Sequence, residues 1–297
     1  MTDSSTPQTT RRRMLLGLGC TALASPALAE SRGRKKRAGP RTRIALSRDA
    51  VHVIEGGQEH VLRDTVFDVT TDYDGNKTGM DIGEGARIDV LRIRLQPGVV
   101  DVDRFIRVGK GVRIGLIDVA AADQTRISDD KQDGFLQIRA DDVEIGEVRF
   151  RNIDRCAQIY RASGVRIGLF ECESYSRGLK ISLSSDVHVG RLHTYTASPY
   201  ATPSPGYNGL TISDSTRLDL PSIEIEDAAE HAIYLAGGGG DAHSQDIRFG
   251  KVITRRSGQC GFKCKAKKML SRNISIDRLV VIDAATLPWI IRAKSML

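Results

Sequence analysis

The sequence predicts an all-β protein, a right-handed single-stranded parallel β-helix (a solenoid) of about 7–8 rungs. The main observation is a short pattern, Val-x-Ile-Gly, that recurs at a near-constant interval along most of the chain. Segments that alternate between apolar and polar residues follow each copy of the pattern, which is typical of β-strands. Aromatic residues make up only 5% of the 297 residues and glycine is plentiful at 29, which favours a core of stacked Val, Ile and Leu strands.

The repeat defines the expected strands. Its close copies are Val112–Gly115, Val143–Gly146, Val165–Gly168 and Val187–Gly190, and its looser copies are Arg217–Leu220, Ile247–Gly250 and Ile274–Asp277. Each copy continues into two further alternating segments, as in Phe170–Glu173 and Leu179–Ser182, so we expect three short strands and three sides per turn. One unit cannot bury its apolar side, whereas rungs stacked about 4.8 Å apart close a continuous core. An α/β solenoid would need a helical period between the strands, and a β-sandwich would not repeat one unit in this way.

The N-terminus has the features of an export signal. Arg11, Arg12 and Arg13 precede the apolar run Leu15–Leu23, and Ala27-Leu28-Ala29 has the small-x-small form of a cleavage site. The segment is similar to a twin-arginine signal cut after Ala29, and it is too short and too rich in glycine to span a membrane. We therefore expect a periplasmic or secreted protein.

The expected organisation has four parts: an export signal at 1–29, a basic disordered linker at 30–43, an N-terminal cap at 44–87 and the parallel β-helix at 88–297. Of the formal charge of +7, the signal contributes +2 and the linker +6, which leaves −1 for the rest. The basic balance of the whole chain therefore says little about the partner of the folded body. Nucleic acid is not an expected partner, because the basic residues of the repeats are not interleaved with aromatic residues.

Four cysteines lie outside the signal: Cys156, Cys172, Cys260 and Cys264. Their spacing fits no zinc-binding template. Cys172 and Cys264 are expected as small buried apolar residues, and a disulfide between any pair that the fold brings together stays open in an exported protein.

The turns of the repeat resemble those of the pectate lyase-like β-helix superfamily. The segments "GLKIS" (Gly178–Ser182), "NGLTIS" (Asn208–Ser213) and "HAIYL" (His231–Leu235) are similar to a strand of that family's first sheet. The resemblance covers about 88–297 and implies that a polysaccharide lies across the outer face of this sheet, parallel to the axis of the coil. Because the architecture hosts lyases, hydrolases, epimerases and phage tail proteins, the resemblance does not imply one reaction.

The resemblance selects the outward residues of these strands as the candidate site. The candidate catalytic residues are Lys180, His231, Tyr234 and Lys263. The candidate substrate-binding residues are Arg139, Tyr160, Arg177, Asn208, Thr211, Glu230 and Lys265. Two long insertions, at 196–207 and 237–245, flank the same turns and are expected to form walls of a cleft.

These residue types favour cleavage of a uronate-containing, anionic polysaccharide by β-elimination. That reaction needs a cation to neutralise the substrate carboxylate and a base to remove the proton next to it, and the lysines, Arg177, His231 and Tyr234 could supply both. Glycoside hydrolysis by Asp227 and Glu230 is the first alternative, since it requires two carboxylates on either side of one bond. The second alternative is a carbohydrate-binding or structural β-helix protein without activity.

A metal requirement stays open. The second outward column contains Glu171 and Glu173 between Arg and His rungs, which predicts a ladder of opposite charges. Calcium held by clustered carboxylates is the alternative for this column, and no calcium motif of the superfamily matches it residue by residue. The chain has no helix after its last expected strand, so we also expect an open last rung that allows self-association.

Overall fold

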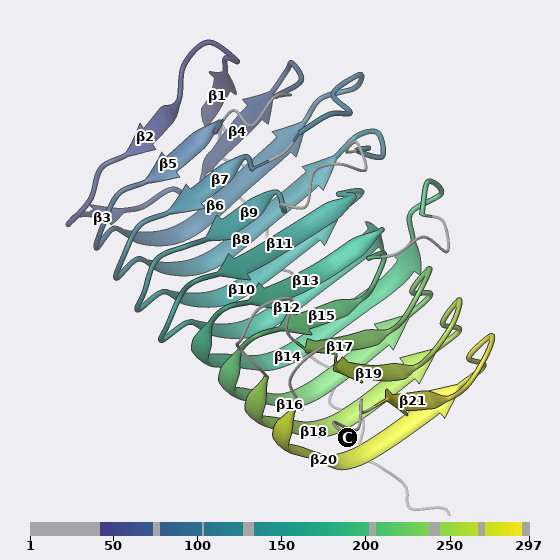
Figure 1. The fold of residues 1–297 in the computed structure, drawn as a ribbon. Coiled ribbons are helices and arrows are strands. Elements are labelled where there is room, and N and C mark those ends of the chain that lie inside the picture. The colour runs from purple at the N-terminus through teal and green to yellow at the C-terminus, as the bar shows by residue number, and fades with distance from the viewer. Residues whose placement is uncertain are drawn as a thin grey trace, which may run out of the picture. The chain divides into compact units, whose positions relative to one another are not determined.

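The fold was analysed in a computed structural model, which describes residues 42–73, 78–102, 104–126, 134–201, 206–237, 244–266 and 271–292. All of them belong to one compact unit, Gly39–Leu297. The described residues form strands and no helix, and therefore no helix among them could cross a membrane. The strands build a parallel β-solenoid of about 8 turns (Figure 1), which confirms the predicted fold class.

The solenoid consists of two sheets in which all strand pairs are parallel. The long sheet contains β1 (Thr42–Leu46), β4 (Thr65–Val69), β6 (Arg87–Leu95), β8 (Arg113–Ala121), β10 (Glu144–Arg151), β12 (Arg166–Tyr175), β14 (Ser185–Ala197), β16 (Thr216–Glu226), β18 (Gln245–Arg255) and β20 (Arg272–Ile282), with β3 (Glu59–His60) paired to β6. The short sheet contains β2 (His52–Ile54), β5 (Met80–Ile82), β7 (Ile106–Val108), β9 (Leu136–Ile138), β11 (Arg155–Tyr160), β13 (Arg177–Ser182), β15 (Leu210–Ser213), β17 (Ile233–Gly237), β19 (Phe262–Ala266) and β21 (Trp289–Arg292).

Each turn has two strands, so the expectation of three separate strands was wrong. The first two predicted segments are continuous in β12, which bends at Gly168. Ile167 and Phe170 both point into the core, and the two residues between them face outward, so the alternation breaks at the bend. The third predicted segment is the strand of the short sheet.

The glycine of the repeat is required at this bend because the turns stack closely there. A Cβ added to Gly146 would lie 2.5 Å from the carbonyl oxygen of Gly115, and one added to Gly168 would lie 2.5 Å from that of Gly146. The same clash recurs at Gly190, 2.7 Å from the carbonyl oxygen of Gly168. Any side chain would have to push two turns apart, which explains why the pattern ends in glycine.

A second column of special backbone lies at the ends of the long strands. Residues there adopt a left-handed conformation, with φ between 50° and 61°, before the chain turns toward the short sheet; they are Asn152, Ser174, Thr196, Asp227, Arg256 and Asp283. Asn and Asp tolerate this region better than other residues with a Cβ. The turn is therefore repeated with the same backbone geometry in successive coils.

The core consists mainly of stacked Ile, Val and Leu side chains, as expected from the composition. A run of aromatic rings also passes through it, from Tyr73 through Phe105, Phe135 and Phe150 to Phe170, with neighbouring ring centroids 4.8 to 6.1 Å apart. Rings at this spacing add to the stabilisation from buried area.

The described cysteines are all free thiols. Cys172 is fully buried, as predicted, whereas Cys264 is only half-buried, contrary to the expectation. Cys156 and Cys260 are buried as well.

The two ends of the described unit differ from the middle. Residues of the expected cap at 44–87 contribute strands β1 to β5 to the same two sheets. On the last long strand, the inward residues Ile274, Ile276 and Leu279 are only half-buried, whereas Phe249 and Val252 on the preceding long strand are buried.

Replacement of Gly168 by alanine tests the close stacking at the bend. We expect Gly168→Ala to lower the free energy of unfolding by about 1 to 3 kcal/mol, because the added methyl group overpacks two turns. Arg166→Ala, at an exposed position in the same strand, is the control and should change stability by less than about 0.5 kcal/mol. Urea unfolding measures both variants, and equal stability of the two would contradict the stacking argument.

Candidate functional site

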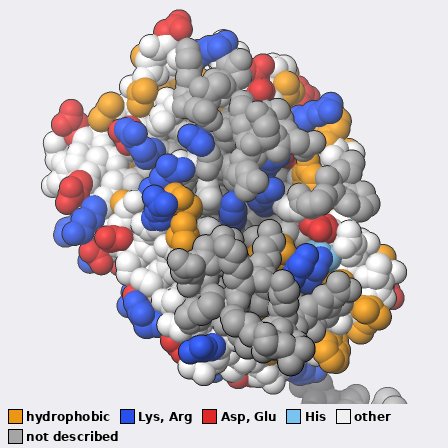
Figure 2. All heavy atoms as spheres, in the orientation of Figure 1, with side chains coloured by type: hydrophobic (Ala, Val, Ile, Leu, Met, Phe, Trp, Pro, Cys, Tyr) orange, Lys and Arg blue, Asp and Glu red, His pale blue; other side chains and the backbone are white. Residues whose placement is uncertain are grey.

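The short sheet places the predicted residues in one row along the axis of the coil. Gln158, Lys180, Thr211, Tyr234 and Lys263 are register partners on the successive strands β11, β13, β15, β17 and β19. We call these residues, together with Gln137 on β9, the outer row. Adjacent strands lie about 4.8 Å apart, so residues distant in sequence become immediate neighbours. Figure 2 shows this side of the molecule, where Lys and Arg side chains occur at several places.

A second row of predicted residues follows two positions later on the same strands. It contains Tyr160, and its last described side chain is the exposed Lys265. The guanidinium groups of Arg139 and Arg161 lie 5.0 and 5.2 Å from the centre of the Tyr160 ring. Tyr160 is thus held between two exposed cations, a suitable surface for an anionic ligand.

A third row lies at the start of the short strands, where the chain enters the sheet. Arg155 pairs with Arg177 in register, and backbone hydrogen bonds continue the row through Asn208, His231 and Cys260. The side-chain oxygen of Asn208 accepts a hydrogen bond from the amide of His231 (3.1 Å). Its side-chain nitrogen lies 3.2 Å from Oγ1 of Thr211, so Asn208 joins this row to the outer row. Asn208 is fully buried, and its contacts are those of a positioning residue.

His231 is the centre of a buried polar cluster. Its Nδ1 accepts a hydrogen bond from the amide of Cys260 (3.3 Å), so a neutral ring carries its proton on Nε2. That nitrogen lies 3.2 Å from Oε1 of Glu230 and 2.6 Å from Nζ of Lys263. Glu230 and Lys263 therefore contact the same nitrogen of His231, and the three side chains form one polar cluster.

The other contacts of Glu230 fix its charge. Its Oε2 accepts a hydrogen bond from the amide of Gly206 (2.7 Å). Burial by itself would raise the pKa of Glu230, but the hydrogen bonds from His231 and Gly206 and the charge of Lys263 outweigh it and lower the pKa. Glu230 is thus an ionised carboxylate that orients His231.

Tyr234 lies above this cluster on the outer row. The centre of its ring is 5.6 Å from that of His231 and 5.3 Å from Nζ of Lys263. Burial, followed by the charge of Glu230, raises the pKa of Tyr234, so the hydroxyl keeps its proton at neutral pH and can act as an acid.

Lys180 lies in a strongly cationic environment. Burial, followed by the charges of Arg177 and Arg155, lowers the pKa of its amine to about 8. Burial and the charge of Arg155 also lower the pKa of Arg177 to about 10, and the nearby Asp154 partly opposes this shift. Lys180 can therefore lose its proton near neutral pH, whereas the guanidinium group of Arg177 remains charged.

Arg155 and Asp154 are functional candidates that the sequence analysis missed. Arg155 is only 2% exposed, and its Nε lies 4.0 Å from the carboxylate of Asp154. Asp154 accepts hydrogen bonds from the side chain of Ser176 and, through its main-chain carbonyl, from the amide of Arg177 (2.9 Å). Alignment of the third segments of the repeat would have placed Arg155 beside Arg177, but nothing in the sequence shows that Arg155 is buried and Arg177 half-buried.

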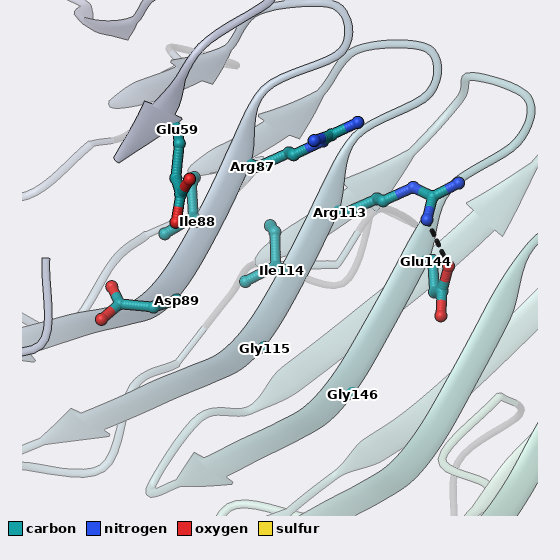
Figure 3. A pocket seen from close by; sticks show the side chains of 9 residues that line it. All are labelled: Glu59, Arg87, Ile88, Asp89, Arg113, Ile114, Gly115, Glu144 and Gly146. Carbon is teal, nitrogen blue, oxygen red and sulfur yellow. Dashed lines mark ion pairs between the residues drawn. The ribbon is translucent and has the colours of Figure 1, made fainter. Parts of the chain in front are cut away.

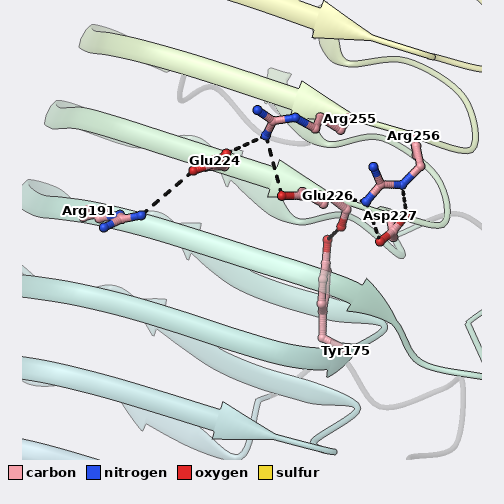
Figure 4. Close-up of polar contacts among 7 residues, drawn as sticks. All are labelled: Tyr175, Arg191, Glu224, Glu226, Asp227, Arg255 and Arg256. Atoms are coloured by element: carbon pink, nitrogen blue, oxygen red, sulfur yellow. Dashed lines mark hydrogen bonds and ion pairs between the residues drawn. The ribbon is translucent and has the colours of Figure 1, made fainter. Parts of the chain in front are cut away.

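The carboxylates of the hydrolytic alternative have other partners. Asp227 is paired with Arg256, whose Nε lies 2.6 Å from Oδ1, and Glu226 accepts from the same guanidinium (Figure 4). Glu230 is bonded to His231 and Gly206, as described above. Both carboxylates of the alternative thus serve structural contacts.

The long sheet carries the predicted ladder of opposite charges. Arg151 donates to Glu173 (2.8 Å), and the Tyr195 hydroxyl donates to Glu171 (3.1 Å). Arg255 donates to Glu224 in the same column (Figure 4). Within the described residues, no group of three or more His, Cys, Asp or Glu side chains is arranged to hold a metal ion.

A groove of about 460 Å³ runs along the bend of the long sheet, away from the predicted site (Figure 3). Its lining includes Gly115 and Gly146, whose missing side chains leave the surface hollow. The charged residues on its rim are mixed, and Arg113 is paired with Glu144 at 3.6 Å. The shape of this groove follows from the glycine column, and no set of convergent groups in it indicates a ligand.

Parts of the two expected cleft walls, 202–205 and 238–243, lie outside the described residues. Of the predicted site, the structure brings Arg177, Asn208, Glu230 and His231 together with the outer-row residues Lys180, Thr211, Tyr234 and Lys263; Arg139, Tyr160 and Lys265 lie in the second row.

Comparisons of this chain with protein-family models, with curated proteins and with solved structures found no match. The functional argument therefore depends on the chemistry of the site.

The buried Glu230 leads to a prediction about stability and pH. Its pKa in the folded protein is lowered, so its contribution to stability is present above the unfolded pKa of about 4.5 and is lost as the pH falls through the folded value. We expect Glu230→Gln to be less stable than the native protein at about pH 7, and the difference to shrink below about pH 4.5. Urea unfolding across this pH range measures it. Glu144→Gln, at an exposed pair, is the control, and a constant difference at all pH values would contradict the assigned charge.

Proposed function

We propose that this protein is an exported enzyme that binds a uronate-containing, anionic polysaccharide along the outer row and cleaves it by β-elimination. The observation that carries the proposal is Lys180, a half-buried lysine in the centre of the row whose pKa is lowered to about 8 beside two charged arginines. A base that can lose its proton close to physiological pH and adjacent fixed cations are the two requirements of this reaction. The resemblance of the repeat to pectate lyase-like proteins supports the same class of substrate.

In the proposed reaction, the half-buried Arg177 neutralises the carboxylate of the uronate residue, and the buried Arg155 adds to the positive charge of the site. The amine of Lys180 removes the proton from the carbon next to the carboxylate, and the electron pair left on that carbon forms a carbon–carbon double bond. The bond from the neighbouring carbon to the glycosidic oxygen breaks, and this oxygen receives a proton from the hydroxyl of Tyr234 or the ammonium group of Lys263. Lys180 then releases the abstracted proton to water, and the donor takes up a proton from water, which returns both groups to their starting state.

Hydrolysis by Asp227 and Glu230 has less support, because each carboxylate is engaged in a structural contact. A carbohydrate-binding protein without activity would use the same row, but it would gain nothing from a lysine with a lowered pKa. Calcium at the column of Glu171 and Glu173 has no specific support, since these carboxylates are bonded to Tyr195 and Arg151.

Export through a twin-arginine-type signal, with cleavage after Ala29, belongs to this proposal because it would bring the enzyme to extracellular polymers. Self-association through the last turn is a further part of it. The half-buried inward residues Ile274 and Ile276 of β20 support an apolar contact with a second copy.

The reaction class is tested with a panel of uronate polymers. We expect the mature protein to produce the ultraviolet absorbance of a conjugated double bond, and Lys180→Ala to lose at least about 100-fold of this activity because the base is missing. Lys251→Ala, on the long sheet, is the matched control and should keep it. Reducing sugar without absorbance would instead indicate hydrolysis, and binding without either product would indicate a binding protein.

The pH dependence tests the role of Lys180 more directly. The base must be neutral to accept a proton, so we expect kcat/KM to rise with pH up to about 8 and then to level off. Lys180→Arg keeps the charge but cannot lose its proton near this pH, so it should bind the polymer without cleaving it. A rate that is flat between about pH 6 and pH 9 would contradict the assignment.

A further inference from the structure

The second row carries a cluster of positive charge at Tyr160, the half-buried last residue of β11. The register that pairs Ile138 with Ile159 places Arg139 beside Tyr160 on the neighbouring turn. Arg161 follows Tyr160 in the chain and has a left-handed backbone, with φ at 52°. The alternation of the strand ends there, and both arginines lie against the same ring, 5.0 and 5.2 Å from its centre.

The ring holds two like charges close to one another. Each guanidinium group is attracted to the ring, whereas the two guanidinium groups repel each other. Arg139 and Arg161 are both exposed, so their donors can reach a ligand. An anionic group beside Tyr160 would accept hydrogen bonds from both arginines and relieve the repulsion between them, because the planar fork of donors on arginine matches the oxygens of an anion.

Open space adjoins this cluster. Arg161 lines a hollow of about 330 Å³ at the turns that follow the short strands, and the exposed side chain of Leu183 lines it as well. Asp141 and Asp214 belong to the same lining and would repel an anion, so the anionic group is expected over Tyr160 and not inside the hollow. The hollow leaves room for the uncharged part of a sugar.

The cluster is also next to the proposed catalytic lysine. Tyr160 is the register partner of Ser182, which follows Lys180 by two positions on β13. One strand spacing across the sheet and two residues along it separate the backbones of Tyr160 and Lys180 by about 8 Å. A polymer that lies along the outer row with one uronate at Lys180 and Arg177 therefore brings neighbouring sugars past Tyr160.

We propose that Arg139, Tyr160 and Arg161 bind a second anionic group of the same polysaccharide chain, carried by a sugar next to the uronate that is cleaved. This inference rests on the proposed function and deepens it. The group is a carboxylate if the neighbouring sugar is another uronate, and a sulfate ester if that sugar is sulfated. In both cases the preferred substrate has anionic groups on consecutive sugars, and a polymer in which uronate alternates with an uncharged sugar binds more weakly.

Calorimetry with three kinds of oligosaccharide tests the proposal. The first are homo-oligomers of galacturonate, mannuronate, guluronate or glucuronate, the second is unsulfated chondroitin, in which uronate alternates with an uncharged sugar, and the third is chondroitin sulfate. We expect Arg139→Gln and Arg161→Gln each to weaken the binding of the homo-oligomers or of chondroitin sulfate about tenfold, because a charge-assisted contact is lost, and to leave the binding of unsulfated chondroitin unchanged. Arg149→Gln, at an exposed ion pair on the long sheet, is the matched control: it removes the same charge and should leave every affinity unchanged.

The outcomes separate this inference from the proposed function. If the native protein binds none of the oligosaccharides, the proposed function fails and the second anion site fails with it. If the native protein binds them and both variants bind equally well, only the second anion site is overturned. A loss confined to the homo-oligomers identifies the group as a carboxylate, and a loss confined to chondroitin sulfate identifies it as a sulfate ester. An equal loss for all three kinds of oligosaccharide overturns the site.

Kinetics give a second readout on any oligosaccharide that the native protein cleaves. Neither arginine is placed at the bond that breaks, so we expect both variants to raise KM and to keep kcat. A variant that loses kcat at an unchanged KM would contradict the assignment.

Discussion

The structure depends on the parallel hydrogen-bonding of each coil to the next in a constant register. This pairing satisfies the backbone of the described inner strands and places equivalent side chains about 4.8 Å apart. The pairing leaves no room for a side chain at the bend of the long sheet, where Gly146 and Gly168 can stack only because neither has a Cβ. The turns that follow the bend repeat a left-handed backbone conformation. A site on a solenoid is therefore a row, whose composition is set one residue per turn.

The two sheets use the same stacking in opposite ways. On the long sheet, charges of opposite sign alternate, and pairs such as Arg151 with Glu173 neutralise one another across neighbouring strands. On the short sheet, Arg155, Arg177 and Lys180 place three cations side by side in a partly buried position, and the pKa values of Arg177 and Lys180 are lowered as a result. Clustered like charges oppose stability, and this contrast is the physical reason for placing the proposed function on the short sheet.

The buried polar groups around this cluster divide into two kinds. Asn208, Glu230 and His231 satisfy one another and the backbone, so they hold the outer-row residues Thr211 and Lys263 in fixed positions without contacting solvent. The two glutamines of the same row, by contrast, keep atoms without partners among the described residues. The satisfied groups therefore form a fixed framework next to the outer row.

The sequence by itself determined the repeat, the parallel solenoid and the alignment of Lys180, Thr211, Tyr234 and Lys263, because register follows directly from a periodic pattern. The sequence did not determine that the first two predicted segments join into one bent strand. Two separate strands would show the same alternation of apolar and polar residues on either side of the glycine. Only the tertiary structure decided which outward residues are buried. Packing between turns distant in sequence lowers the pKa of Lys180, keeps Glu230 charged and buries Gln158. The local sequence pattern carries no information about this packing.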